Sequence, residues 1–347
     1  MNRFEYFLYR TKTAWSSFVA LYKLPQEKVD AFVNAFDVFE HDWRDEEKLK
    51  QSFGDEYYLV AKKKLQDYYS VLNLILSMGS IEKMYVPPIM DTKRGLFQNQ
   101  EIFEEQMMGD LQIQPMDRVL DIGCGRGRIA AHVVRKTKAH VTGINIDEEQ
   151  LKTAKEFVNK TNLQEKTEFK LEDMNDLPLK FSDNSFHAVY QIQAFSYSKD
   201  LYKLIKEIHR VLKPGGRVSS CDWATLDEYN PSNPEHVQKV HCIKPLLGAV
   251  GTPTKEEFID AFQKAGFKII KAEVPSATKT DDINIDKASK EFGRIHSLIR
   301  VLVKIKILPK HFMTLLNQLC QHVDTFIEVD QRKLASSNFH IVAEKVE

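Results

Sequence analysis

A glycine-rich loop that directly follows a short apolar run constrains this sequence more than any other feature. The run Val119-Leu120-Asp121-Ile122 contains an acid near its end, and Gly123, Gly125 and Gly127 then occupy alternate positions before a helical segment. Glycine permits tight backbone turns and lets a ligand approach the main chain without meeting a Cβ atom. The loop therefore predicts a nucleotide-like ligand bound against the backbone at the end of a strand.

Two details of this loop favour S-adenosylmethionine over a dinucleotide. The spacing is D-x-G-x-G-x-G rather than G-x-G-x-x-G, and no phosphate-binding lysine follows it. The acid suits a cationic ligand that carries an α-ammonium group. We predict that Asp121, Gly123, Gly125 and Gly127 bind S-adenosylmethionine.

Three further strand ends supply the rest of the predicted cofactor site. The run VTGIN ends at Asn145, about twenty residues after the loop, where folds of this kind contact a ribose hydroxyl. The next run ends before Asp173 and Met174, of which the first can accept from an adenine amino group and the second can pack on the ring. Gln191, in the following run HAVYQI, completes the set.

Apolar runs alternate with helical stretches from Arg118 onward, for example Glu148–Lys160 and Lys199–Leu212. This alternation is typical of an α/β fold with a Rossmann-like, doubly wound and mostly parallel sheet. Helical apolar spacing dominates before it and again at 275–330, and the strand-like run FHIVAEK follows at 339–345.

We predict three consecutive domains from these shifts in pattern. Residues 1–100 form a helical region that covers the substrate, residues 101–272 bind the cofactor, and residues 273–347 form a C-terminal domain.

Composition and charge limit the partners and the compartment. The sequence balances 49 Lys and Arg against 49 Asp and Glu, which disfavours nucleic acid as a partner. No paired cysteine motif is present, and His132, His140 and His209 are expected as surface or helix residues, so we predict no metal site. The widely spaced cysteines predict a reducing, cytoplasmic compartment. No run can span a bilayer, which predicts a protein that is either free or peripheral at the endoplasmic reticulum membrane.

One basic amphipathic stretch, Arg300–Lys310, allows two readings. It can lie on a membrane surface that carries an apolar substrate, or it can form a helix that faces the core, and we favour the core-facing helix. The sequence leaves formation of a homo-oligomer open.

A second motif downstream gives the sequence a family resemblance. Asp222-Trp223, followed by Asp227, Tyr229 and Asn233-Pro234-Glu235-His236, resembles the stretch E-W-x-x-T-D-x-Y-D-P-x-N-P-E-H of the sterol methyltransferases. Tyr68-Tyr69, the turn Lys213–Gly216 and Ala265-Gly266-Phe267 also resemble the family, so that the likeness covers roughly residues 60–345. The resemblance implies S-adenosylmethionine-dependent methyl transfer to a sterol and a C-terminal α+β domain of the family type.

The departures from the family share one chemistry, because they remove acids. The positions of an N-terminal acid and aromatic block are held here by residues such as Ser77, the family Glu by Gln193, and its His by Tyr197. A later acidic stretch aligns with residues that include Lys244 and Leu247. Glu82 and Asp222 are the nearest acids that could replace those lost.

The missing acids bear on which atom is methylated. Methylation at C-24 of a sterol side chain makes a carbocation, which carboxylates and aromatic faces stabilise before a base removes a proton. We therefore expect an acceptor other than C-24. Sterol-methyltransferase-like enzymes of nematodes, associated with methylation at C-4 of the nucleus, are the most similar variation. Tyr69 and Tyr197 are the candidate catalytic residues.

The substituted positions are mostly apolar, which predicts a large apolar pocket above the methyl group of the cofactor. Residues 68–85, Gln193–Tyr197 and the stretch after Trp223 should line it. Two alternatives stay open. The acceptor can be another small molecule, such as a phosphobase or an apolar metabolite, or the chain can be a degenerate protein that binds the cofactor without catalysis. The intact glycine loop disfavours the second alternative.

Overall fold

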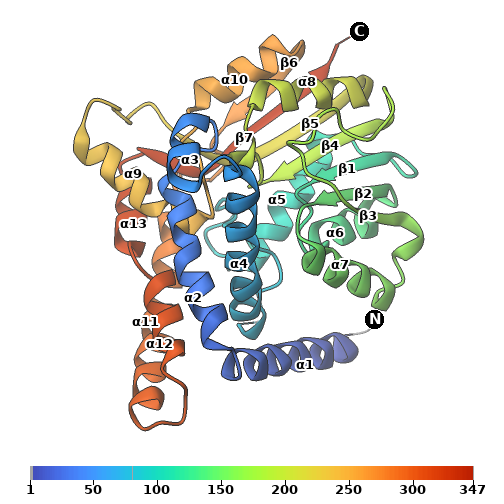
Figure 1. Ribbon diagram of the computed structural model, residues 1–347. Helices are drawn as coiled ribbons and strands as arrows, with labels where there is room; N and C mark the ends of the chain where they lie inside the picture. The colour runs from blue at the N-terminus through green and yellow to red at the C-terminus, as the bar shows by residue number, and fades with distance from the viewer. Residues whose placement is uncertain (1–2, 80, 347) are drawn as a thin grey trace. The chain divides into compact units, whose positions relative to one another are not determined.

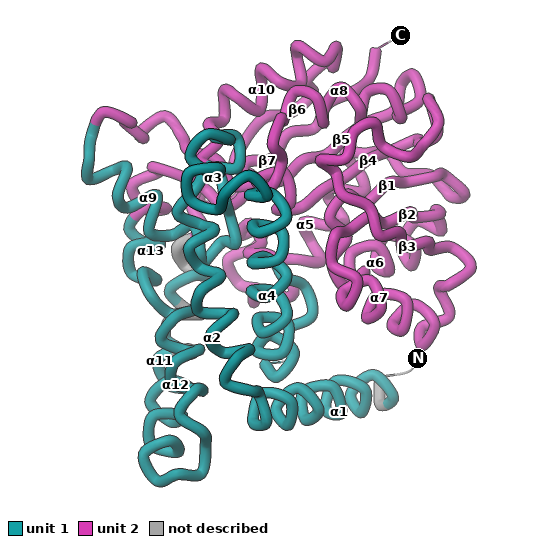
Figure 2. The backbone as a smooth tube through the Cα atoms, in the orientation of Figure 1, with its two compact units in different colours: residues 1–84, 233–251, 282–328 teal, residues 85–232, 252–281, 329–347 magenta. Residues whose placement is uncertain are grey.

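The chain divides into two compact units in this computed structural model, which describes residues 3–79 and 81–346. Unit 1 consists of residues 1–84, 233–251 and 282–328, and unit 2 consists of residues 85–232, 252–281 and 329–347 (Figure 2). Each unit is thus assembled from separate stretches, whereas the pattern of the sequence had indicated three consecutive segments.

Unit 2 contains a seven-stranded sheet with the strand order β3-β2-β1-β4-β5-β7-β6 (Figure 1). Strands β1 to β5 pair in parallel, and β7 runs antiparallel to both of its neighbours. The predicted Rossmann-like, mostly parallel sheet is confirmed. The strands are β1 (Arg118–Ile122), β2 (His140–Asn145), β3 (Thr167–Leu171), β4 (Phe186–Ile192), β5 (Leu212–Thr225), β6 (Phe267–Glu273) and β7 (Ala335–Lys345).

Helices follow the parallel strands and cover the sheet. The helices α6 and α7 pack against β2 and β3, and α8 and α10 pack near β5 to β7. Because both faces are covered, most residues of strands such as β1 and β4 are buried. The helices of unit 2 are α5 (Leu96–Asp110), α6 (Arg128–Thr137), α7 (Glu148–Lys160), α8 (Leu201–Val211) and α10 (Lys255–Lys264).

The last strand of the chain sits inside the sheet rather than in a separate C-terminal body. Strand β7 pairs with β5 through positions such as Cys221 and His340, and with β6 on its other side. Nine consecutive residues of β7 are buried, as expected for a strand with neighbours on both edges. Residues 329–347 therefore belong to the same unit as the predicted cofactor loop.

The turn Lys213–Gly216 interrupts the pairing of β4 with β5. Phe186 pairs with Leu212, but Ala188 pairs with Arg217, so the residues between them are displaced from the ladder. Gly215 adopts a φ of 74°, which glycine tolerates without strain.

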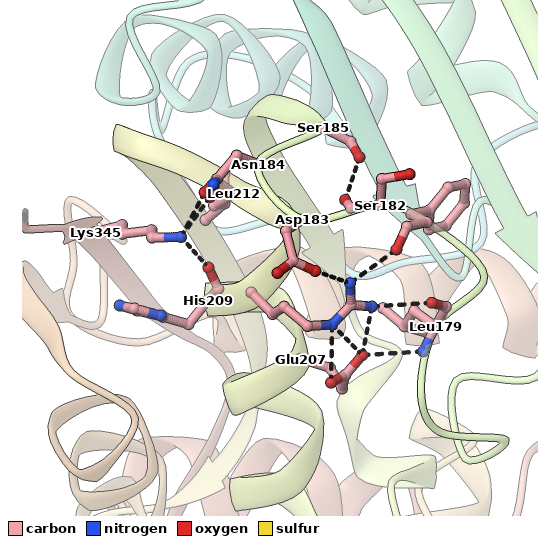
Figure 3. Close-up of polar contacts among 11 residues, drawn as sticks. Leu179, Ser182, Asp183, Asn184, Ser185, Glu207, His209, Leu212 and Lys345 are labelled. Carbon is pink, nitrogen blue, oxygen red and sulfur yellow. Dashed lines mark hydrogen bonds and ion pairs between the residues drawn. The ribbon is translucent and has the colours of Figure 1, made fainter.

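A polar cluster fixes the segment that leads into β4 (Figure 3). Arg210, in the last turn of α8, donates to carboxylate oxygens of Glu207 at 2.8 Å and of Asp183 at 2.7 Å. It also donates to two main-chain carbonyls in residues 179–185. Lys345 donates to the carbonyl oxygens at the end of α8 at 2.8 and 2.7 Å, which satisfies groups that a helix end leaves without partners.

Unit 1 is helical, in agreement with the apolar spacing of the N-terminal region. Its helices are α1 (Arg3–Tyr22), α2 (Gln26–Asn34), the 3-10 helix η1 (Ala35–Glu40), α3 (Glu46–Phe53), α4 (Tyr57–Met78), α9 (Pro234–Leu247), α11 (Asp282–Lys304) and α12 (His311–Leu319), and α13 (Val323–Gln331) continues into unit 2. No helix in the described part of the chain is long and apolar enough to cross a membrane.

Aromatic packing around α4 organises unit 1. The ring of Tyr68 lies 5.7 Å from that of Phe32, 5.4 Å from Phe36 and 5.0 Å from Phe39. Its hydroxyl donates to the carbonyl oxygen of Pro245 at 3.0 Å, which ties α4 to α9. Tyr68 is therefore a buried packing residue.

The stretch Asn233-Pro234-Glu235-His236 begins α9. The Asn233 side chain accepts from the main-chain N–H of Glu235 at 3.0 Å, and Pro234 occupies the first turn. An Asn cap followed by Pro is a strong helix start, because the cap satisfies a main-chain donor and Pro has none to satisfy. This family-like motif thus has a structural role in unit 1.

Candidate cofactor and active site

The parallel pairing brings the predicted cofactor residues of β1, β2 and β3 to one edge of the sheet. Asp121 pairs with Gly143 on one side and with Tyr190 on the other. Asn145 pairs with Leu171, the last residue of β3. Because these strands are parallel, their carboxyl ends meet at the same edge, where ligands of such sheets bind.

Asp121 is buried next to a hydroxyl group that sequence reasoning did not identify. The Tyr190 hydroxyl donates to Asp121 Oδ2 at 2.8 Å. Burial raises the pKa of Asp121 to about 7, the hydrogen bond from Tyr190 opposes this rise, and the charge of Glu104 adds to it. The carboxyl group is therefore poised to ionise when a cation binds beside it.

The three loop glycines differ in what surrounds them. A Cβ atom on Gly123 would lie 2.5 Å from the Ala194 Cβ, and one on Gly127 would lie 2.7 Å from the Phe169 ring. A Cβ on Gly125 would meet only the Gln150 Oε1, at 3.6 Å. Gly123 and Gly127 are therefore required by packing, whereas Gly125 faces open space of the kind a ligand can fill.

The second strand end is braced by a helix that follows it. Asn145 donates from Nδ2 to Gln150 Oε1 at 2.9 Å. Gln150 lies in the first turn of α7, whose cap Asp147 accepts from the main chain of Glu149 and Gln150. The same Gln150 oxygen is the nearest atom to the open side of Gly125, so both residues border one space.

The segment after β3 is tied to the segment after β4. Asp173 Oδ1 accepts from the main-chain N–H of Asn175 at 3.0 Å. Asn175 then donates from Nδ2 to the Tyr197 carbonyl oxygen at 3.0 Å and accepts from the Lys199 main-chain N–H at 2.8 Å. Met174 packs against the main apolar core of the sheet. The structure thus brings Tyr197 toward Asp173 through Asn175, which sequence reasoning missed.

Gln191 is placed differently from the other predicted cofactor residues. Its side chain is fully buried, donates to the Ser220 hydroxyl at 2.7 Å and accepts from the Ala194 main-chain N–H at 2.8 Å. The amide of Gln191 therefore holds the start of the 193–197 segment through its hydrogen bond to Ala194.

Asp222, considered as a replacement acid, also holds this segment. Its Oδ2 accepts from the Phe195 main-chain N–H at 2.7 Å, and its Oδ1 accepts from the Trp223 N–H at 2.8 Å. Burial raises the pKa of Asp222 to about 6, and these hydrogen bonds limit the rise. Both carboxylate oxygens accept hydrogen bonds from main-chain N–H groups, so Asp222 holds the 193–197 segment in place.

Gln193 explains why this chain has no acid at that position. Its Nε2 donates to the carbonyl oxygens of Val86 at 3.2 Å and of Ser337 at 3.0 Å, and its Oε1 accepts from the Val86 N–H at 3.4 Å. A carboxylate cannot donate, and it would oppose two carbonyl oxygens. The amide is thus matched to its surroundings.

Tyr69 lies in unit 1, as do the remaining positions at which the family resemblance indicates a lost or replacement acid. The Tyr69 ring packs edge-on against that of Tyr68, with 5.1 Å between centroids. Ser77 lies on α4 and Leu247 on α9. Glu82 accepts from the Tyr6 hydroxyl at 2.5 Å.

Lys244 is a buried residue of α9. Its Nζ donates to the His41 carbonyl oxygen at 3.1 Å. Burial lowers the pKa of Lys244 to about 8, and the charges of Asp42 and Glu40 oppose this shift. The ammonium group therefore has a hydrogen-bond partner within unit 1. The family resemblance indicates an acidic stretch at this position.

The predicted substrate pocket draws on segments of both units, and its lining stays a prediction. Residues 68–84 belong to unit 1, and Gln193–Tyr197 belong to unit 2. A different cavity of about 320 Å³ lies within unit 1 and is lined mainly by residues of η1, α9 and α12.

A buried polar cluster near β4 and β5 was missed by sequence reasoning. The Tyr85 hydroxyl donates to Glu104 Oε1 at 2.8 Å, and the imidazole of His132 donates to Glu104 Oε2. All three side chains are buried, and the Tyr85 ring packs with Cys221 and Ile192. His132 does lie on a helix, as expected, but as a partner of a buried acid. A Glu directly after the apolar Phe103 was the available signal.

Comparison with known proteins agrees with this arrangement. A family model described as a methyltransferase domain matches residues 120–220. A sterol 24-C-methyltransferase of Gibberella zeae is 31% identical over 267 residues, covering 70% of this chain and 69% of that protein.

Solved structures show the same fold. The [4+2]-cyclase SpnF superposes with a TM-score of 0.64 at 19% identity, covering 82% of this chain and 96% of that one. A geranyl diphosphate C-methyltransferase of Streptomyces coelicolor, solved with S-adenosyl-L-homocysteine, gives 0.55 at 17% identity and covers 72% and 82% of the two chains.

The sheet, the glycine loop and these matches define a class I S-adenosylmethionine-dependent methyltransferase. The donor set fits that cofactor, because the edge offers an acid for a cationic ligand, amide groups for a ribose, and a glycine whose Cβ position is open. The chain belongs to the sterol methyltransferase family.

Proposed function

We propose that this methyltransferase acts on a sterol or a sterol-like lipid, and that the methylated atom is not C-24. C-4 of the sterol nucleus is the favoured acceptor. The sterol substrate of the relative from Gibberella zeae supports the substrate class. The amide of Gln193, which donates to two main-chain carbonyls, is the observation that carries the choice of atom.

The cofactor site of this proposal follows the edge formed by β1, β2 and β3. Asp121 faces the cationic end of the cofactor, and the main chain at Gly123, Gly125 and Gly127 lies against it. Asn145 contacts the ribose, and Asp173 with Met174 contacts the adenine. Gln191 positions the loop from within the sheet, since both ends of its amide are already bonded.

The acceptor side offers little negative charge among the residues considered. Gln193 is neutral, and both oxygens of Asp222 are engaged by main-chain N–H groups. A carbocation in a dry site needs charges that are preorganised toward it. An acceptor that is activated before methyl transfer, such as the carbon next to a ketone, does not need a cation-stabilising wall.

The bound cofactor supplies an electrophilic methyl group. Transfer to a carbon acceptor replaces one C–H bond with a C–C bond, so one proton must leave. In this proposal the hydroxyl groups of Tyr69 and Tyr197 orient the acceptor or carry that proton. Asn175 holds the main chain of Tyr197 in place.

Product analysis tests the proposal. The protein is incubated with methyl-labelled cofactor and, in parallel, with a Δ24-sterol, a 3-ketosteroid or a phosphobase. Label at C-4 of the steroid nucleus, lost in Tyr197→Phe or Tyr69→Phe, is the expected result. Efficient labelling at C-24 would overturn the choice of atom, and labelling of the phosphobase alone would overturn the substrate class.

A further inference from the structure

Large apolar side chains are exposed on two helices of unit 1. On α1, Phe7 is 64% and Trp15 is 65% exposed, and Leu8 and Tyr22 are also exposed. Leu8, Trp15 and Tyr22 recur every seven residues, so they lie along one line of the helix. Polar groups would ordinarily occupy such a line.

The second group lies on α11 and in the turn after it. Leu298 is 58% and Ile305 is 57% exposed, and Ile295, Val301 and Ile307 are exposed as well. Spacings of three and four residues place Ile295, Leu298, Val301 and Ile305 on one face. The core-facing interpretation of Arg300–Lys310 is therefore wrong for Val301, Ile305 and Ile307, although Leu308 is buried.

Basic residues accompany these apolar side chains. Residues 293–310 contain Arg294, Arg300, Lys304, Lys306 and Lys310 and no Asp or Glu. All five are exposed. The whole chain has no net formal charge, so this local excess of positive charge is a property of the segment.

The C-terminal end of α1 lies close to the second group within unit 1. The rings of Phe18 on α1 and Phe312 on α12 lie 6.1 Å apart, and the His311 side chain is hydrogen-bonded to the Leu21 carbonyl oxygen at 2.8 Å. The end of α1 thus packs against the start of α12, directly after the 305–310 turn. Figure 1 shows α1 and the α11–α12 turn at the same end of unit 1.

We propose that α1 and residues 294–310 form a docking surface for a membrane rich in anionic lipid. Exposed aromatic and aliphatic side chains among Lys and Arg are typical of segments that lie in the lipid interface. Contiguous exposed apolar surface mostly marks an interaction site.

Charge selects the membrane over a second copy of the chain. A symmetric dimer through this surface would gather the basic segments of both protomers in one interface, because a two-fold interface uses one patch twice. Like charges would then oppose one another, whereas anionic headgroups complement them. The surface does not depend on the identity of the methyl acceptor.

Vesicle sedimentation of the full chain tests the proposal. Vesicles of phosphatidylcholine with about one third phosphatidylserine should bind the protein, and pure phosphatidylcholine should bind it far less. Lys304→Ala with Lys306→Ala should lower partitioning about 25-fold, at about fivefold for each basic residue. Raising salt from about 0.1 M to about 1 M should release the protein.

A matched control separates the surface from general hydrophobicity. Leu298→Glu should weaken binding by roughly tenfold or more, which is the effect of burying one apolar side chain in the membrane. Leu59→Glu on α4, where Leu59 is 62% exposed, should leave binding unchanged. Equal loss in both variants, or no binding of the unaltered chain to anionic vesicles, would overturn the proposal. So would a concentration-dependent dimer that Leu298→Glu dissolves. Vesicles without sterol keep this result independent of the substrate assignment.

Discussion

The carboxyl edge of the sheet consists of two parts whose polar groups are used differently. At the ends of β1 and β2, Asp121 and Asn145 are held by single side-chain partners beside a glycine with open space. At the ends of β4 and β5, Gln193 and Asp222 are bonded to main-chain groups of surrounding segments. The first part leaves open space beside Gly125, and the second part holds a loop through main-chain hydrogen bonds.

This difference bears on how a family can change its acceptor. The cofactor part keeps its glycines because two of them are packed and the third is open. The acceptor part replaces a charge with an amide and gains hydrogen bonds to distant main-chain carbonyls. Under the proposed function, the acceptor can therefore change while the cofactor residues stay the same.

The largest expected effect is at Gly125. Asn tolerates the left-handed backbone that a φ of 51° requires, so Gly125→Asn should fold while its side chain fills the ligand space. We expect a loss of cofactor affinity of about a hundredfold, which is the effect of roughly 2.7 kcal/mol. Titration calorimetry with the cofactor measures it, and an unchanged melting temperature is the control. Full cofactor affinity in Gly125→Asn would show that the open space beside Gly125 is not the cofactor site.

The matched substitution at Gly127 should act on folding instead. A Cβ there would lie 2.8 Å from the Ala154 Cβ and 2.7 Å from the Phe169 ring, and φ is 67°. Gly127→Ala should lower the free energy of unfolding by about 2 to 3 kcal/mol, because packed neighbours must move. Denaturant unfolding gives the value. A fully stable Gly127→Ala protein would show that the two glycines are equivalent.

Gln193→Glu tests the second half of the edge. The new carboxylate would face the carbonyl oxygens of Val86 and Ser337, which now accept from the amide. We expect the free energy of unfolding to fall by about 2 kcal/mol at neutral pH, which is within the range for a buried polar group without a hydrogen-bond partner. The loss should shrink at low pH, where the carboxyl group is protonated and can donate. Gln193→Met, which has no charge, is the matched control. A stable Gln193→Glu protein with new C-24 activity would show that the contacts of Gln193 do not require an amide.

The parts that the sequence predicted are those with local signals. Val119–Ile122 is an apolar run and the glycines follow at fixed spacing, so the strand and the loop are determined within a short window. The bonds of Gln193 reach Val86 and Ser337, which are 107 and 144 residues away in the chain. No local pattern contains such contacts. The insertion of β7 between β5 and β6 has the same origin.

Amphipathic spacing has a related limit. The pattern of Arg300–Lys310 correctly indicates a segment with two faces, but it does not say which face is covered. Neighbouring helices decide that, and they leave Val301, Ile305 and Ile307 exposed while Leu308 is buried. Glu104 was missed for a similar reason, since its partners Tyr85 and His132 come from distant segments.

The last predicted effect, about tenfold for a change of one pH unit, concerns the pH dependence of cofactor binding through Asp121. Burial raises the pKa of Asp121 to about 7 from an ordinary 3.8. A group whose pKa is raised by folding favours the folded state below its unfolded pKa, and this contribution is lost as pH rises from about 4 to about 7. The ligand-free protein should thus become less stable over that range.

Cofactor binding should change in the opposite direction. A cationic ligand prefers the ionised carboxylate, so binding below pH 7 requires Asp121 to lose a proton first. Affinity should therefore fall about tenfold for each pH unit below the pKa and level off above it. Calorimetry across this range measures the midpoint. Tyr190→Phe removes the donor that stabilises the carboxylate, so it should move the midpoint to higher pH, whereas Asp121→Asn should bind weakly with no such dependence. An affinity that is flat in pH for the unaltered chain would place the cationic end of the cofactor away from Asp121.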